Sequence, residues 1–184
     1  MQVEEELARL SSDNDMLLTI GVFDGIHLGH RYLISQLKEL ARQQGLHSGV
    51  VTFSQHPQKI LSSQTRLPFL TNLTQRINLL KNEGVEVIIT LSFTSELAKL
   101  SARQFLGLLK KYLRMRGIVI GPDFALGRNR EGNTETLRQL GQEMGFSVTV
   151  VPPIIIDGEV VSSTTIREAL AKGDMKRVQN FIGR

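Results

Sequence analysis

Apolar runs of strand length alternate with helical patterns along the whole of this 184-residue sequence. The strand-like runs are 16–23, 49–53, 85–91, 117–121 and 146–151. The clear helical patterns between and after them are 30–44, 74–83, 101–114, 134–144 and 165–172. Because each strand is almost continuously apolar, the expected sheet is parallel and covered by helices on both faces. The sequence therefore predicts a doubly wound α/β domain with about five parallel strands.

In a doubly wound sheet, ligands bind beyond the carboxyl ends of the strands, where the strand order reverses. The segments to search therefore begin directly after Phe23, Phe53, Leu91, Gly121 and Val151. A long polar segment, 56–73, follows the second strand and shows no clear periodicity. Inside a compact domain, a segment of that length is typical of a functional loop.

The composition favours a soluble intracellular protein. The chain has no cysteine, so it has no disulfide framework, no thiol nucleophile and no cysteine-based zinc site. Its first residues are acidic, whereas a secretory signal needs a basic start and an apolar run. The apolar runs are far shorter than the roughly 20 residues of a membrane span. We therefore expect a cytoplasmic protein with no membrane partner.

The formal net charge of +4 suits small polyanionic substrates and also fits an ordinary protein surface. The densest basic run consists of Lys110, Lys111, Arg114 and Arg116. This run falls on what is expected to be a solvated helix face, so we expect no nucleic-acid partner.

The first strand leads into a loop with three glycines and two histidines, Gly21-Val22-Phe23-Asp24-Gly25-Ile26-His27-Leu28-Gly29-His30. Glycines allow this loop to turn tightly and approach a ligand closely. The next helix is expected to start near His30, so its N–H groups and positive dipole end would face the ligand. The spacing matches neither a P-loop nor a dinucleotide fingerprint.

Two structural explanations of this loop compete with a functional one: an ordinary turn with incidental histidines, or a His-x-x-His metal pair. The coincidence of two histidines and three glycines at the expected ligand edge favours a phosphate site. In that site His27 and His30 would donate hydrogen bonds to charge that grows in a transition state.

A second polar segment, 162–170, lies near the C-terminus. Thr165 and Glu168 have the spacing of a capping box, which explains part of this segment structurally. The residues expected to pack inward are Ile166, Ala169 and Leu170. Arg167 then lies off the apolar face, where an arginine beside hydroxyls and N–H groups suits a polyphosphate. A capped surface helix is the alternative.

A third segment, 121–132, follows the fourth strand. It combines Asp123, Phe124, Arg128 and Arg130 in a loop at the expected ligand edge. Binding residues are often carried on such loops, and a solvated turn is the alternative.

Together these segments resemble the HxGH nucleotidyltransferase superfamily, and specifically the FMN adenylyltransferase module of the bacterial riboflavin kinase/FAD synthetase family. The resemblance covers almost the whole chain in order, through 21–30, 51–53, 56–57, 100–102, Phe105, 121–124, 162–164 and 166–167. The His-x-Gly-His element marks only the superfamily. Phe-Asp-Gly before it, the Asp-Phe loop and the Ser-Ser-Thr-x-Ile-Arg run mark this branch. The family usually has a second aromatic two residues after Phe124, where this chain has Leu126.

The resemblance implies a Rossmann-like sheet of the nucleotidyltransferase type and the transfer of AMP from ATP to FMN, giving FAD and pyrophosphate. It implies catalytic roles for His27, His30 and Arg167. The implied ATP-binding residues are Phe23, Asp24, Gly25, Gly29, Ser162, Ser163 and Thr164. The implied flavin-binding residues are Phe53, His56, Pro57, Asp123 and Phe124. It implies Mg²⁺ with the ATP, held mainly by phosphate oxygens rather than by protein ligands.

Most relatives in this family continue into a riboflavin kinase module. We therefore expect residues 1–184 to form a single nucleotidyltransferase domain without a riboflavin kinase domain, and FMN to come from such a module or from another enzyme. Two alternatives remain open. One is a related transferase with another phosphorylated acceptor, such as phosphopantetheine or nicotinamide mononucleotide, and the other is a non-catalytic nucleotide- or flavin-binding module.

Overall fold

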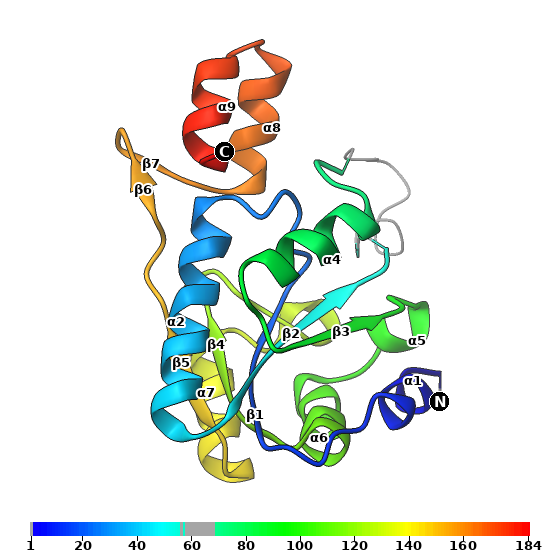
Figure 1. Cartoon of the computed structure of the whole chain (residues 1–184). Coiled ribbons are helices and arrows are strands. Elements are labelled where there is room, and N and C mark those ends of the chain that lie inside the picture. Colours follow the sequence, from blue (N-terminus) through cyan, green and yellow to red (C-terminus); the bar gives the residue numbers. More distant parts are fainter. Residues whose placement is uncertain (1, 56, 58–68) are drawn as a thin grey trace.

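Five parallel strands form the central sheet of the molecule (Figure 1). The computed structural model describes residues 2–55, 57 and 69–184. The strands are β1 (Met16–Ile20), β2 (His47–Phe53), β3 (Val87–Leu91), β4 (Met115–Ile120) and β5 (Ser147–Val150). Their order is β3-β2-β1-β4-β5, and every neighbouring pair is parallel. The predicted doubly wound sheet is confirmed, and its strand order reverses between β1 and β4.

Helices cover both faces of this sheet, as continuously apolar strands predict. One face packs against α1 (Gln2–Arg9), α5 (Ser95–Ala98), α6 (Ala102–Leu113) and α7 (Thr134–Met144). The other packs against α2 (Leu28–Gln44) and α4 (Leu73–Asn82). Because successive side chains of a strand point to opposite faces, Leu18 joins the first core and Leu17 the second.

A third, smaller core lies near the start of α2 (Figure 1). It is formed by α8 (Ser163–Ala171) and α9 (Met175–Ile182), which follow a two-stranded hairpin of β6 (Ile155–Ile156) and β7 (Glu159–Val160). The buried residues that hold the two helices together are Ile166, Ala169, Val178 and Phe181.

Two expectations for α8 are wrong. Its capping box is made by Ser162 and Thr165, not by Thr165 and Glu168, because the helix begins at Ser163 and the Ser162 side chain accepts from the Thr165 N–H. Leu170 is 41% exposed, because Ile166 and Ala169 form the face that meets α9.

Helix α9 follows what the sequence indicated as the last clear helix. Asp174 caps its start and Gly183 ends it in a left-handed conformation. Its apolar face consists of Val178, Phe181 and Ile182, at the spacing of a helix. This short pattern was a usable signal that the sequence analysis left out.

Helix α2 begins at Leu28, with His27 as its N-cap, rather than near His30 as predicted. The side chain of His27 accepts from the backbone N–H of His30. His27 therefore lies at the boundary of the helix and His30 in its first turn, which determines how the two imidazoles face each other.

No helix in the part of the chain that is described has both the length and the apolar character needed to cross a membrane.

Candidate active site

The loop between β1 and α2 spans 21–27 and begins where the strand order reverses. Phe23 (φ 53°), Gly25 (φ 82°) and Ile26 (φ 40°) have left-handed backbone conformations. For the two residues other than glycine, this conformation costs about 1–3 kcal/mol each. Both side chains are buried in the core beneath α2, with exposed fractions of 2% for Phe23 and 0% for Ile26. Packing therefore holds the loop in a shape that its own backbone disfavours.

The carboxylate of Asp24 joins this loop to two distant segments. Its Oδ1 accepts from the backbone N–H and the hydroxyl of Thr71, at 2.9 and 3.1 Å. Its Oδ2 accepts from the backbone N–H of Leu70 at 2.9 Å and from the guanidinium of Arg167 at 2.5 Å. The hydroxyl of Ser163 donates to the backbone oxygen of Asp24 at 3.0 Å. Asp24 thus fixes the loop to the start of α4 and to α8.

The imidazoles of His27 and His30 stack with their centroids 3.7 Å apart and their planes 22° from parallel. The Nδ1 of His27 accepts from the backbone N–H of His30 at 3.4 Å, so a neutral His27 carries its proton on Nε2. The Nδ1 of His30 is buried and has no hydrogen-bond partner among the described residues. The pair therefore offers polar atoms for a ligand at the end of β1.

Burial lowers the pKa of His27 to about 4, although Asp24 opposes this effect and Arg167 adds to it. Burial, together with the neighbouring His27, also brings the pKa of His30 well below its usual value. Both imidazoles are therefore neutral at pH 7 before a ligand binds. A bound polyphosphate would favour their charged forms, because a nearby opposite charge raises the pKa of a histidine.

Gly29 allows the starts of α2 and α8 to approach each other. A Cβ on Gly29 would lie 2.9 Å from the backbone oxygen of Val161 and 3.2 Å from the ring of His27. The first of these contacts involves backbone, which cannot move away cheaply. A side chain at this position would push apart two helix N-termini, whose N–H groups and dipoles can bind an anion.

Two pockets meet at the carboxyl ends of β1 and β4. The smaller has a volume of about 350 Å³ and the larger about 660 Å³. The smaller is lined by both histidines and by Ser162 and Ser163. The walls that the pockets share are formed by Ile20, Gly21, Asp123 and Phe124. A ligand in one pocket can therefore reach a ligand in the other.

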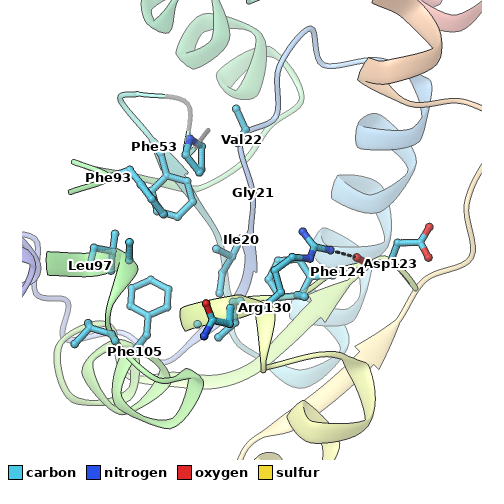
Figure 2. A pocket seen from close by; sticks show the side chains of 17 residues that line it. Ile20, Gly21, Val22, Phe53, Phe93, Leu97, Phe105, Asp123, Phe124 and Arg130 are labelled. Atoms are coloured by element: carbon cyan, nitrogen blue, oxygen red, sulfur yellow. Dashed lines mark hydrogen bonds between the residues drawn. The ribbon is translucent and has the colours of Figure 1, made fainter. Parts of the chain in front are cut away.

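The larger pocket is mainly apolar (Figure 2). Phe53 and Phe93 meet edge to face on its wall, with centroids 5.4 Å apart. Its other apolar residues are Ile20, Val22, Pro57, Leu97, Ala98, Leu100, Phe105, Phe124, Ala125 and Leu126. Leu126 is 8% exposed and also belongs to the core beneath α6. The dimensions and the apolar surface suit a flat aromatic ligand.

The structure brings most of the predicted site residues together. The smaller pocket is lined by Phe23, His27, Gly29, His30, Ser162 and Ser163, the larger by Phe53 and Pro57, and both by Asp123 and Phe124. The predicted residues that line neither pocket are Asp24, Gly25, Thr164 and Arg167. Arg167 is bound to Asp24, with 14% of its side chain exposed. His56 lies outside the described residues.

Arg76 on α4 is a residue of this region that the sequence analysis missed. Its side chain is 1% exposed, and Nη1 donates to the backbone oxygens of Val22 and Phe53 at 2.7 and 3.1 Å. It therefore ties the end of β1 to the end of β2. Burial lowers the pKa of Arg76, while Asp24 raises it. Its position four residues before the buried Leu80 was a signal that it faces inward.

Arg184 holds the histidine loop from the opposite side. Its guanidinium donates to the backbone oxygens of Gly25 and Ile26, at 2.8 and 3.0 Å. No local pattern in the sequence connects residues 159 positions apart.

Residues 2–55, 57 and 69–184 contain no group of three or more histidine, cysteine, aspartate or glutamate side chains that could hold a metal ion. Asp123 is the one carboxylate among the described residues that line the two pockets.

Comparison with known sequences identifies clear relatives. The model of the FAD synthetase family matches residues 9–165. The bifunctional riboflavin kinase/FMN adenylyltransferase of Escherichia coli K12 is 34% identical over 168 residues, which make up 91% of this chain and 54% of that protein. A protein of the same description from Listeria monocytogenes is 31% identical over 173 residues, 94% of this chain and 55% of the relative. The chain thus spans about half the length of these curated relatives.

Two solved structures are similar over most of the chain. A crystal structure of a macrolide-efflux protein from Streptococcus pneumoniae has a TM-score of 0.85 and 29% sequence identity, over 100% of this chain and 59% of that one. Thermotoga maritima TmcAL bound with alpha-thio ATP has a TM-score of 0.57 and 12% identity, over 91% and 53% of the two chains. The second likeness shows the fold alone.

Proposed function

This chain belongs to the FAD synthetase family, and on that premise we propose that it is an FMN adenylyltransferase, which transfers AMP from ATP to FMN and releases pyrophosphate. We take residues 1–184 as one nucleotidyltransferase domain. The relatives named above are described as bifunctional riboflavin kinase/FMN adenylyltransferases, and FMN would reach this site from such a kinase module or from a separate enzyme.

The observation that carries this proposal is the pair of adjoining pockets. One offers two neutral imidazoles, two serines and two helix N-termini, which suit phosphate groups. The other is large, mainly apolar and lined by phenylalanines, which suits an isoalloxazine ring. ATP would bind in the smaller pocket and FMN in the larger, with their phosphates meeting at the walls that both pockets share.

The reaction is a direct displacement. An oxygen of the FMN phosphate forms a bond to the α-phosphorus of ATP, and the bond from that phosphorus to the oxygen bridging to the β-phosphate breaks. Pyrophosphate leaves with the electron pair of the broken bond. No atom of the protein becomes covalently attached, so the protein contributes by aligning the two phosphates and by stabilising charge in the transition state.

His27 and His30 would stabilise that charge. The proton on Nε2 of neutral His27 is available to a phosphate oxygen, and His30 stacks directly against it. Removing one such donor typically lowers a rate by 10²- to 10³-fold. Because their pKa values lie below the usual histidine range, ATP binding would be accompanied by proton uptake wherever the phosphates raise those values across the working pH.

The start of α8 would bind the β- and γ-phosphates. Ser162 and Ser163 line the smaller pocket, and Thr164 is exposed in the first turn of the same helix. Arg167 would act from beside this turn, where it is held by Asp24. Asp24 and Gly25 would contribute by positioning the loop, because the Asp24 carboxylate is already hydrogen-bonded within the protein.

The nucleotide substrate would be the magnesium complex of ATP. Mg²⁺ prefers oxygen ligands and keeps several waters, so phosphate oxygens can provide most of its coordination. Asp123 is the carboxylate of the described pocket lining that is placed to supply one further oxygen.

The decisive experiment is to incubate the purified chain with ATP, Mg²⁺ and FMN and to separate the flavins by chromatography. We expect FAD and an equal amount of pyrophosphate only when all three are present. Pyrophosphate release with phosphopantetheine or nicotinamide mononucleotide, and none with FMN, would instead identify another acceptor. Tight binding of ATP and FMN without turnover would identify a non-catalytic binding module.

A further inference from the structure

We infer that Arg130 recognises the phosphate of the acceptor, so that this residue makes the site select a phosphorylated flavin over an unphosphorylated one. The inference rests on the proposed function, because it assigns Arg130 to the acceptor side of that site.

Arg130 lies where the two pockets meet. It lines the larger pocket, and its Nη2 donates to the backbone oxygen of Asp123 at 3.2 Å. Asp123 belongs to the walls that both pockets share, and Figure 2 shows the guanidinium directed toward it. In a direct displacement the acceptor phosphate must lie at this junction, because its oxygen attacks a phosphorus held in the smaller pocket.

Arg130 also has the appropriate charge and free donors. Among the described residues that line the two pockets it is the only lysine or arginine. The contact with Asp123 uses one N–H group, whereas a guanidinium carries five in a planar fork that matches phosphate oxygens. An apolar pocket binds riboflavin and FMN rings equally well, so discrimination between them requires a cation of this kind.

The backbone around Arg130 is held in an unusual conformation. Asn129 and Arg130 have φ values of 53° and 56°, in the left-handed region that residues other than glycine rarely adopt. Such residues persist only where the surrounding structure fixes them, and they gather at binding sites. Here the N–H of Arg128 donates to the backbone oxygen of Leu100 at 2.8 Å.

The rest of this loop is anchored on the start of α6. A Cβ on Gly127 would lie 2.5 Å from the backbone nitrogen of Ala102, and one on Gly132 would lie 2.7 Å from its Cβ. The carboxylate of Glu131 accepts from the same backbone N–H of Ala102 at 2.9 Å. The loop therefore presents Arg130 from a fixed backbone, which reduces the ordering cost of binding.

The chain offers a matched control in the same loop. Arg128 is an exposed arginine that pairs with Glu131 at 3.4 Å and lines neither pocket. Replacing Arg128 or Arg130 by glutamine removes the same charge two residues apart, so long-range electrostatic effects are nearly equal in the two variants.

The test compares the dissociation constants of FMN, riboflavin and ATP for the wild type, Arg130→Gln and Arg128→Gln, by calorimetry or flavin fluorescence. We expect Arg130→Gln to weaken FMN binding roughly 10- to 100-fold, as for the loss of a charge-assisted hydrogen bond. Riboflavin and ATP binding should change less than about twofold. Arg128→Gln should change none of the three, and Arg130→Lys should restore part of the preference for FMN.

An equal loss of FMN and riboflavin binding in Arg130→Gln would mean that Arg130 only supports the pocket wall, and would overturn the inference. Unchanged FMN binding, or a loss confined to ATP, would overturn it as well. FAD formation by the wild type tests the proposed function separately. A wild type that makes no FAD but loses its preference for FMN on Arg130→Gln would retain the inference and lose the function.

Discussion

The loops that follow β1 and β4 meet at one site, and both contain left-handed residues other than glycine. In the β1 loop, Phe23 and Ile26 are buried in the core, and Asp24 is hydrogen-bonded to three other segments. In the β4 loop, Asn129 and Arg130 are exposed, and the backbone and glycines hold the loop in place.

This difference separates two tasks. The β1 loop is fixed by its side chains, so a substitution there disturbs packing and hydrogen bonds as well as the ligand. The β4 loop is fixed by its backbone, so its side chains remain available for a ligand and can change without loss of the fold. We therefore expect changes in the β1 loop to affect stability and turnover, and changes in the β4 loop to affect acceptor affinity.

Asp24→Asn should produce the largest effect on stability. It leaves the guanidinium of Arg167 without its charged partner in a nearly buried position, and breaking such a pair costs about 3–5 kcal/mol. Urea unfolding at neutral pH measures this loss. The matched variant is Asp123→Asn in the β4 loop, where the side chain is exposed and we expect a change within about 0.5 kcal/mol. Equal losses in the two variants would remove the distinction between the loops.

His30→Ala should lower the rate of FAD formation by roughly 10²- to 10³-fold, because it removes a donor to the transition state. The melting temperature should change little, since alanine is compatible with the first turn of α2. His47→Ala is the control, because His47 pairs with Glu86 at the opposite end of β2. A His30→Ala variant with near-normal turnover would exclude this histidine from the mechanism.

The stability of the ligand-free protein should fall as the pH is lowered from about 6.5 to 4. Unfolded His27 takes up a proton near its ordinary pKa, whereas burial delays protonation of the folded form to about pH 4. Stability is therefore complete above the unfolded pKa, and about 3 kcal/mol is lost across this interval. Urea unfolding as a function of pH measures it. In His27→Asn, which keeps an N-cap side chain, this part of the slope should disappear. An unchanged slope would assign the effect to other groups.

A pair of glycine substitutions compares the left-handed positions directly and should give the smallest effects. Ile26→Gly relieves strain but removes a fully buried side chain, so we expect a net destabilisation of about 2 kcal/mol. Asn129→Gly relieves similar strain at an exposed position, where the change should stay within about 0.5 kcal/mol. Equal destabilisation by both variants would show that side-chain burial does not distinguish the two loops.

The position of the site was predictable because it depends on local patterns. The apolar runs identify the strands, and the carboxyl ends of β1 and β4 carry the histidine loop and the Asp-Phe loop that the sequence analysis selected. The boundary of α2 was less predictable, because His27 is not among the usual N-cap residues. The roles of Asp24 and Arg76 were not predicted, because a single sequence does not reveal which distant groups a buried charge will meet.

Periodicity and residue type alone determined that this chain forms a doubly wound parallel sheet with a phosphate-binding loop after its first strand. Both depend on interactions within a few residues, where the chain geometry is nearly fixed. Tertiary structure decided which residues form the pocket walls, that Arg167 binds Asp24 across 143 positions, and that Arg130 lies at the junction of the two pockets. These contacts depend on how whole elements pack, and a difference of a few kcal/mol between packings leaves no local signal in the sequence.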